Sequence, residues 1–131
     1  VRGWRLELIF SVLILDQLTK FFAGRFFPSR VIANAGLPFL GIDLPGSFDF
    51  WIVLAVFVIF IVLYQRYLEG SRTSLGFSLI LGGALSNLGE RIFLGRVRDF
   101  IDVGLGNTFN LADIAIMIGI TLIALRAIRN S

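Results

Sequence analysis

The amino-acid sequence predicts an all-α membrane protein in which four transmembrane helices form a single domain over residues 1–131. Three observations lead to this fold class. The chain is 56% hydrophobic and 16% charged, whereas soluble domains are on average about half apolar and about a quarter charged. The apolar residues fall in long blocks instead of alternating with polar ones. Finally, a chain of this length can supply about four bilayer-crossing helices of roughly 20 residues, with short connections.

The first half of the chain contains two of the expected helices. Residues 6–27 form the first apolar block, which Pro28 closes, and we expect a permanent helix because no small-residue cleavage site follows it. Proline, glycine and asparagine in residues 29–47 predict a loop or a short interfacial element. Residues 48–64 are the most continuous apolar run, with aromatic residues near both ends.

The second half contains the other two expected helices. After a polar turn, residues 74–93 form a block whose glycines allow close approach between membrane helices. Residues 95–108 predict a charged connection that contains glycine, and residues 109–125 predict the fourth helix. Four spans place both termini on one side of the membrane. Basic residues are equally numerous on the two sides, but several on the non-terminal side lie beside carboxylates, which favours cytoplasmic termini.

The composition also excludes several kinds of site. The chain contains no cysteine and no histidine, so it has neither a thiolate nucleophile nor the imidazole ligands common at zinc, copper and iron centres. We therefore expect no metal and no cofactor. The net charge is +3, but the basic residues are scattered singly between apolar blocks, where they can meet anionic lipid headgroups. We expect membrane lipids as partners and no nucleic acid.

Polar side chains in the apolar blocks mark a candidate site. A charged residue near the centre of a membrane helix costs about 2.5–3.5 kcal/mol, so such residues need a structural or functional reason. The costly residues are Asp16, Lys20, Asn34, Asn87, Glu90, Arg91, Asp99, Asn110 and Asp113. In the expected topology they gather at the membrane face opposite the termini. This distribution is typical of a catalytic or transport site that is open to water on one side.

Local spacing suggests roles for some of these residues. Asp16 and Lys20 are four residues apart, so a helix places them on one face, and a structural ion pair explains them without any function. Glu90 and Arg91 are adjacent and do not face each other, so each needs another partner. Arg91 is therefore a candidate to hold a carboxylate.

Asp99 and Asp113 are the candidate catalytic pair. Asp99 follows the third expected helix and Asp113 begins the fourth, so an antiparallel hairpin of these helices can bring them together. Two carboxylates that share a site hold one proton between them, so one can deprotonate water while the other donates to a carbonyl. The rival pair is Asp99 with Asp102, which is three residues further on. Spacing alone does not decide between the two pairs.

Five segments, in order along the whole chain, resemble the motifs of the lipoprotein signal peptidases, also called type II signal peptidases. The segments are DQLTK at 16–20, NAG at 34–36 followed by Phe39, GGALSN at 82–87 followed by Arg91, VRDF at 97–100, and FNLAD at 109–113. The resemblance implies a four-helix inner-membrane fold with cytoplasmic termini and a small extracytoplasmic sheet between the first two helices. It also implies catalysis by Asp99 and Asp113.

The same resemblance implies the substrate and the supporting residues. The substrate would be a prolipoprotein whose cysteine carries diacylglycerol, cut on the amino side of that cysteine without metal or cofactor. The residues implied to bind substrate or support the dyad are Asn34, Gly36, Asn87, Arg91 and Asn110. The residues expected as structural polar support are Asp16, Lys20 and Glu90. We expect the enzyme to be a monomer.

Three positions depart from the family pattern. Glu90 stands where the family usually has Asp, Pro38 replaces a small residue, and Arg98 replaces an apolar residue directly before Asp99. A cation close to the dyad would favour ionisation of both carboxylates, whereas a side chain that points away would change nothing. These departures keep an inactive relative of the peptidase as an alternative.

Two alternatives belong to other functional classes. A small transporter or channel subunit could use Asp16, Lys20 and Asp113 as a proton or ion relay, although a relay needs a polar path across the membrane. A structural assembly subunit would explain the glycines of residues 74–93 but not the costly aspartates.

Overall fold

The computed structural model describes residues 5–34, 59, 74–104 and 108–129. Three long helices dominate these residues: α1 (Leu6–Phe26), α3 (Ser74–Leu94) and α4 (Leu111–Arg129). The short 3-10 helix η1 (Pro28–Arg30) follows α1. Apart from residue 59, the expected helix at residues 48–64 lies outside the described residues, as do Gly36 and Pro38.

The helix boundaries agree with the expected ones at α1 and α3 and differ at α4. Pro28 lies two residues after the end of α1, because a proline restricts the residue before it and cannot continue the helical bonding. The prediction that the fourth helix begins at residue 109 is wrong, since Phe109 lies in a strand and α4 begins at Leu111. The apolar block continues across this boundary, so hydrophobicity alone does not reveal it.

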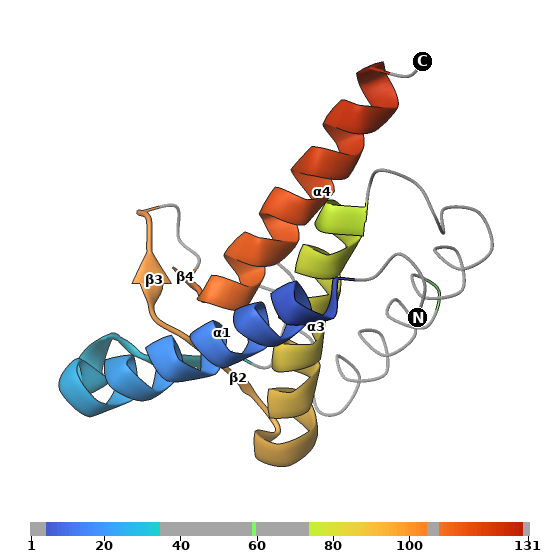
Figure 1. Cartoon of the computed structure of the whole chain (residues 1–131). Helices are drawn as coiled ribbons and strands as arrows, with labels where there is room; N and C mark the ends of the chain where they lie inside the picture. The colour runs from blue at the N-terminus through green and yellow to red at the C-terminus, as the bar shows by residue number, and fades with distance from the viewer. Residues whose placement is uncertain (1–4, 35–58, 60–73, 105–107, 130–131) are drawn as a thin grey trace.

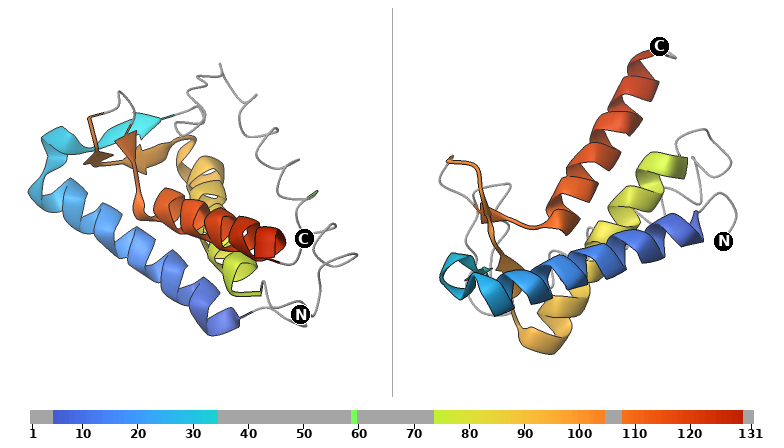
Figure 2. Two further views of the ribbon diagram at one scale, coloured as in Figure 1. Left: turned by 90° about the horizontal axis from the view of Figure 1, so that it is seen from above. Right: turned by 60° about the vertical axis from the view of Figure 1, so that its left-hand side comes forward.

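Helix α3 packs against both α1 and α4, and its contact with α4 is the more extensive (Figures 1 and 2). Glycines make these approaches close. A Cβ added to Gly76 would lie 2.8 Å from the carbonyl oxygen of Gly119, and one added to Gly83 would lie 2.5 Å from that of Ala112. A Cβ on Gly82 would lie 2.9 Å from a side-chain atom of α1. The register makes α3 and α4 an antiparallel pair, as the candidate site requires.

Two small antiparallel sheets join the helix ends. β1 (Ile32–Asn34) pairs with β2 (Val97–Asp99), so that Ala33 lies opposite Arg98. β3 (Ile101–Asp102) pairs with β4 (Thr108–Phe109). Both views in Figure 2 show the strands gathered between the C-terminal end of α1 and the N-terminal end of α4.

The implied strand element after the first helix is present as β1. The partner of β1 lies in the connection between α3 and α4. That connection was predicted without any strand. Strands of two or three residues are too short to produce a recognisable alternation of polar and apolar residues, which explains the omission.

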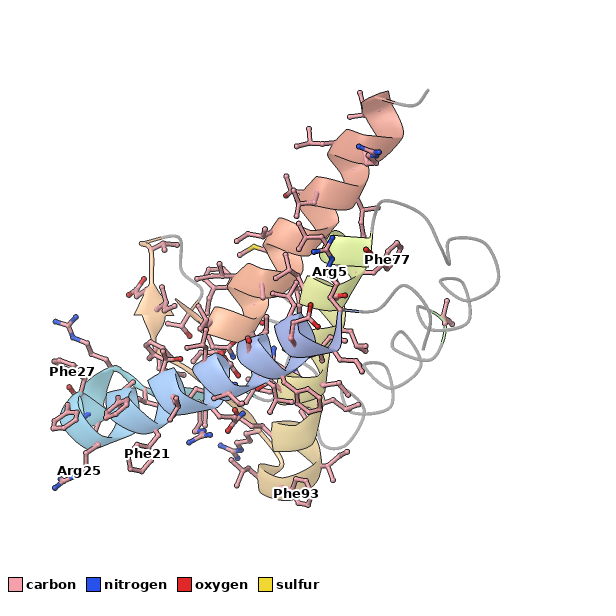
Figure 3. The ribbon with its side chains drawn as sticks, in the orientation of Figure 1. Arg5, Phe21, Arg25, Phe27, Phe77 and Phe93 are labelled. Atoms are coloured by element: carbon pink, nitrogen blue, oxygen red, sulfur yellow. The ribbon has the colours of Figure 1, made fainter. Side chains whose placement is uncertain are left out.

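Polar residues lie inside the described structure and many large apolar side chains lie outside. Side chains such as Phe21, Phe27 and Phe93 extend away from the helices, and Phe93 is 85% exposed (Figure 3). The fully buried side chains include Asp16 and Lys20. Among the residues that the structure describes, no helix is both long and apolar enough to cross a membrane.

Candidate active site

The buried polar residues come from all three helices, from β2 and from position 110, which directly precedes α4. They are Asp16, Lys20, Ser78, Ser86, Asn87, Glu90, Arg91, Asp99, Asn110 and Asp113. Except for the two serines, every member of this set was a candidate from the sequence. Most of them form one hydrogen-bonded network where the C-terminal half of α1, the C-terminal half of α3 and the N-terminus of α4 meet.

Asn110 links the two candidate catalytic aspartates. Its side-chain nitrogen donates to Asp99 Oδ1 at 2.7 Å, and its side-chain oxygen accepts from the backbone N–H of Asp113 at 2.9 Å. In return, the backbone N–H of Asn110 donates to Asp113 Oδ2 at 3.2 Å. Asn110 and Asp113 thus cap the first turn of α4 reciprocally, in the manner of a capping box. Asp99 and Asp113 are each at most 2% exposed, and Asn110 contacts both of their carboxylates.

Asn87 connects this pair to the rest of the network. Its amide nitrogen donates to Asp113 Oδ1 at 3.0 Å. Its oxygen accepts from Asn110 Nδ2 at 3.1 Å and from Lys20 Nζ at 3.2 Å. Because an amide both donates and accepts, Asn87 can contact a carboxylate and an ammonium group at once, and it links α3 to the other two helices.

Asp16 and Lys20 form the expected ion pair on α1, with 2.6 Å between Lys20 Nζ and Asp16 Oδ2. Lys20 also pairs with Glu90. Asp16 accepts hydrogen bonds from Ser86 Oγ and from the backbone N–H of Ala112, the latter at 2.8 Å. A buried charge is tolerated when it is paired and its remaining hydrogen-bonding positions are filled. These contacts agree with a supporting role for both residues.

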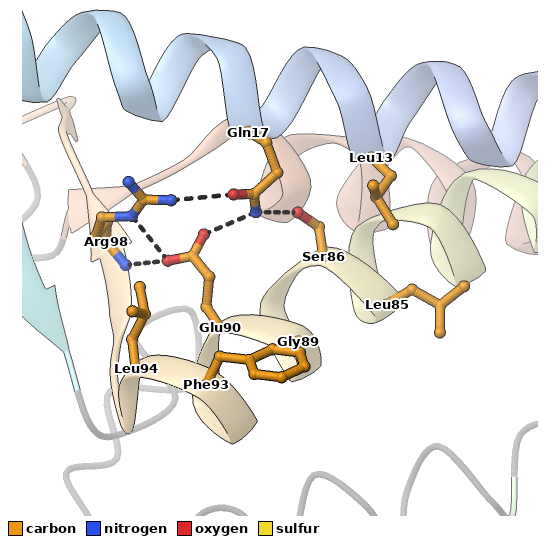
Figure 4. A pocket seen from close by; sticks show the side chains of 9 residues that line it. All are labelled: Leu13, Gln17, Leu85, Ser86, Gly89, Glu90, Phe93, Leu94 and Arg98. Atoms are coloured by element: carbon orange, nitrogen blue, oxygen red, sulfur yellow. Dashed lines mark hydrogen bonds and ion pairs between the residues drawn. The ribbon is translucent and has the colours of Figure 1, made fainter.

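Glu90 is the centre of a second polar cluster, which joins Gln17 on α1 to Arg98 on β2 (Figure 4). Its Oε1 accepts from the backbone N–H of Arg98 at 3.0 Å and from Arg98 Nε at 3.1 Å. Its Oε2 accepts from Gln17 at 3.0 Å, and Arg98 Nη2 donates to Gln17 Oε1, also at 3.0 Å. The Arg98 guanidinium is thus paired with Glu90 and Gln17, and two of the three departures from the family pattern meet each other.

The other predicted residues lie as follows. Arg91 is 8% exposed on α3, and Asn34 ends β1, where its backbone is paired with Val97. Asp102 is exposed, and its carboxylate accepts from the backbone N–H of Gly104. The rival pair of Asp99 with Asp102 therefore lacks the burial that the Asp99 and Asp113 pair has. Gly36 lies outside the described residues.

Two network residues had no role assigned from the sequence. Gln17 and Ser86 lie directly beside Asp16 and Asn87 in the motifs, and Gln17 Nε2 donates to Ser86 Oγ at 2.9 Å. The sequence signal for both is that each is a polar residue next to a costly polar residue in an apolar block. Arg98 was considered only for its effect on the dyad. No group of three or more histidine, cysteine or acidic side chains in the described part of the chain is arranged to hold a metal ion.

Comparisons with known proteins identify relatives along nearly the whole chain. The model of the signal peptidase II family matches residues 8–129. The lipoprotein signal peptidase of Blochmanniella pennsylvanica is 42% identical over 105 residues, which cover 72% of this chain and 63% of that protein. The lipoprotein signal peptidase of Aquifex aeolicus is 37% identical over 139 residues, with coverage of 92% and 83%.

Two solved structures, both described as bacterial membrane enzymes, share the fold. The first has a TM-score of 0.77 at 23% identity and covers 95% of this chain and 87% of its own. The second has a TM-score of 0.76 at 25% identity, with coverage of 96% and 93%. Since the family match extends over almost every residue, the chain belongs to the signal peptidase II family, the family of the lipoprotein signal peptidases.

Proposed function

We propose that this protein is an aspartyl endopeptidase that removes the signal peptide from diacylglyceryl-modified prolipoproteins, cutting on the amino side of the lipidated cysteine. Membership of the signal peptidase II family supports the reaction and the substrate class. It also favours a peptidase over the transporter and assembly-subunit alternatives. The residue assignments rest on the geometry of the buried network.

Asp99 and Asp113 are the proposed catalytic pair, and the observation that carries this assignment is their joint attachment to Asn110. One side-chain amide contacts the Asp99 carboxylate and the first turn of α4 that presents Asp113. Asn87 adds a second amide donor to Asp113. Two aspartates held this way can act as one unit that shares a proton.

The proposed reaction needs one ionised and one protonated carboxyl group. The carboxylate removes a proton from water, whose oxygen adds to the carbonyl carbon of the residue before the cysteine, while the acid donates its proton to the carbonyl oxygen. When the carbon–nitrogen bond breaks, the aspartate that took the proton from water gives it to the cysteine nitrogen, and the other aspartate takes a proton from a hydroxyl group of the diol. The signal peptide retains the new carboxyl group, and the pair returns to its starting state. Asn87 and Asn110 orient the pair throughout.

The remaining proposed contacts lie around the pair. Asn34 and Gly36 would contact the peptide substrate, which the position of β1 supports for Asn34 because β1 pairs with the strand that carries Asp99. Arg91 would support the loops near the site. Asp16, Lys20 and Glu90 would hold the helices together.

We further propose a multi-pass protein of the bacterial inner membrane, with four transmembrane helices, cytoplasmic termini and a monomeric state. Polar residues inside and exposed large apolar residues outside are the arrangement expected where lipid is the solvent. In this proposal three of the four spans correspond to α1, α3 and α4, although none of these helices has the length and hydropathy of a fully apolar span. The dyad would then open toward the face opposite the termini.

The experiment that tests this function is cleavage by the purified protein in detergent or lipid. A prolipoprotein carrying a diacylglyceryl-cysteine is the substrate, and the same polypeptide without lipid is the control. We expect mass spectrometry to find a product that begins with the lipidated cysteine, and little cleavage of the control. An absence of cleavage under conditions where a related peptidase is active would contradict the proposal and favour the inactive relative.

A further inference from the structure

The Glu90 carboxylate binds the backbone immediately before Asp99. Glu90 Oε1 accepts two hydrogen bonds from one residue, the backbone N–H of Arg98 at 3.0 Å and its Nε at 3.1 Å. Glu90 is on α3, whereas Arg98 is the middle residue of the three-residue strand β2. The contact therefore ties the strand to the helix one residue away from a proposed catalytic group.

The same strand residue is held from its other side. The carbonyl oxygen of Arg98 accepts from Asn110 Nδ2 at 3.2 Å, and the same nitrogen donates to Asp99 Oδ1 at 2.7 Å. Arg98 also lies opposite Ala33 in the β1–β2 ladder. With the N–H of Arg98 held by Glu90 and its carbonyl group held by Asn110, the two peptide units on either side of the Arg98 Cα are both anchored, and the backbone that leads into Asp99 has little freedom.

The side chain of Arg98 completes this attachment. Its guanidinium bonds Glu90 through Nε and Gln17 through Nη2, so it joins α3 to α1. Glu90 is only 4% exposed, while the Arg98 side chain is 32% exposed. A buried carboxylate needs charge partners, and Glu90 has Lys20 on one oxygen and Arg98 on the other. Among the partners that the described residues provide, removing the guanidinium would leave Oε1 bound only through the backbone N–H of residue 98.

We propose that Glu90 and Arg98 are a coupled pair of positioning residues that set the placement of Asp99 for the reaction. The proposal rests on the assignment of Asp99 as a catalytic residue. The two residues act through the backbone of β2, and the carboxylate and the guanidinium depend on each other. Because a displacement of about 1 Å in a catalytic group can cost on the order of a hundredfold in rate, a partial loss of this attachment is measurable.

The test is a double-mutant cycle on cleavage of the lipidated prolipoprotein. Glu90→Gln keeps the shape but removes the charge, and Arg98→Met keeps much of the apolar stem but removes the guanidinium. We expect each single variant to lower kcat about tenfold with KM within about twofold. The double variant should also lose only about tenfold, since the second change removes a partner that is already lost. Arg98→Lys should retain an intermediate kcat.

Arg96 provides the matched control, because it is an exposed arginine in the same connection. Arg96→Met should keep the wild-type kcat. The melting temperature of every variant in detergent shows whether the protein remains folded at the assay temperature. If Glu90→Gln does not fold, the comparison of Arg98→Met with Arg98→Lys still tests the proposal, since Arg98 is partly exposed and a merely structural role would not produce a graded kcat in folded protein.

Two results would overturn the inference. Wild-type kcat in folded Arg98→Met would show that the guanidinium does not position the site, and a loss of about a hundredfold in the double variant would show that the two residues act independently. Asp99→Asn in the same assay separates this inference from the proposed function. If Asp99→Asn is inactive but Arg98→Met is normal, only the positioning role fails. If Asp99→Asn cleaves normally, the catalytic assignment itself fails.

Discussion

Asp16 accepts a hydrogen bond from the backbone N–H of Ala112 at 2.8 Å, across a sequence separation of 96 residues. The first N–H groups of a helix have no partner within the helix, and its N-terminus favours negative charge. Asp16, which lies on α1, provides both a hydrogen-bond acceptor and a negative charge at the N-terminus of α4. The turn that presents Asp113 is thus held by its own cap, Asn110, and by a carboxylate from the opposite end of the chain.

The first prediction follows from this contact. Asp16→Asn removes the charge that pairs with Lys20 and weakens the acceptor at Ala112, so we expect the free energy of unfolding to fall by about 3 kcal/mol and the melting temperature in detergent to fall by about 10 °C. Some turnover should remain. Glu7→Gln, which changes an exposed carboxylate on the same helix, should leave the melting temperature unchanged. Unaltered stability with abolished turnover would show that Asp16 acts in the chemistry instead.

The second prediction concerns the packing of α3 on α4. A Cβ at Gly83 would meet the carbonyl oxygen of Ala112 at 2.5 Å, so Gly83→Ala must push α4 away and should lower the melting temperature by about 5 °C, together with the activity. Gly89 is on the same helix, and a Cβ added there would have no neighbouring atom within 4 Å beyond its own helix turn. Gly89→Ala should keep or raise the melting temperature, because alanine favours helix. Equal effects of the two changes would contradict this packing.

The third prediction is the pH dependence of cleavage. If Asp99 and Asp113 share one proton, kcat/KM should follow a bell-shaped profile, since activity falls when both groups are protonated and again when both are ionised. The two limbs describe the pair and belong to neither residue alone. Initial rates with the lipidated prolipoprotein across an acidic to alkaline series provide the measurement. A profile with a single limb would indicate that only one ionisable group is required.

The sequence was sufficient to predict the three long helices that the structure describes, because hydrophobic blocks and a terminating proline are local signals. It was insufficient at the start of α4, where the apolar residue Phe109 belongs to a strand. A capping signal was present in Asn110 and Asp113, which are three residues apart. The pairing of β1 with β2 could not be read from either segment, because it depends on where the helix ends lie in space.

The clustering of the site residues was predictable from topology, but most of their partners were not. Four-residue spacing predicts the contact of Asp16 with Lys20 on one helix face. The contact of Gln17 with Arg98 spans 81 residues and depends on how α1 crosses α3. The sequence left open whether Arg98 places a cation near the dyad, and the structure pairs its guanidinium with Glu90 and Gln17.

The most direct measurement of the catalytic assignment is cleavage of a diacylglyceryl-modified prolipoprotein by Asp99→Asn, Asp113→Asn and the double variant. An amide can neither take a proton from water nor supply one, so each single variant should be slower by about a thousandfold or more while remaining folded. The double variant should be no slower than the slower single one. Asp102→Asn, which changes an exposed neighbour, should cleave normally. Substantial processing by either Asp99→Asn or Asp113→Asn would contradict the aspartyl mechanism.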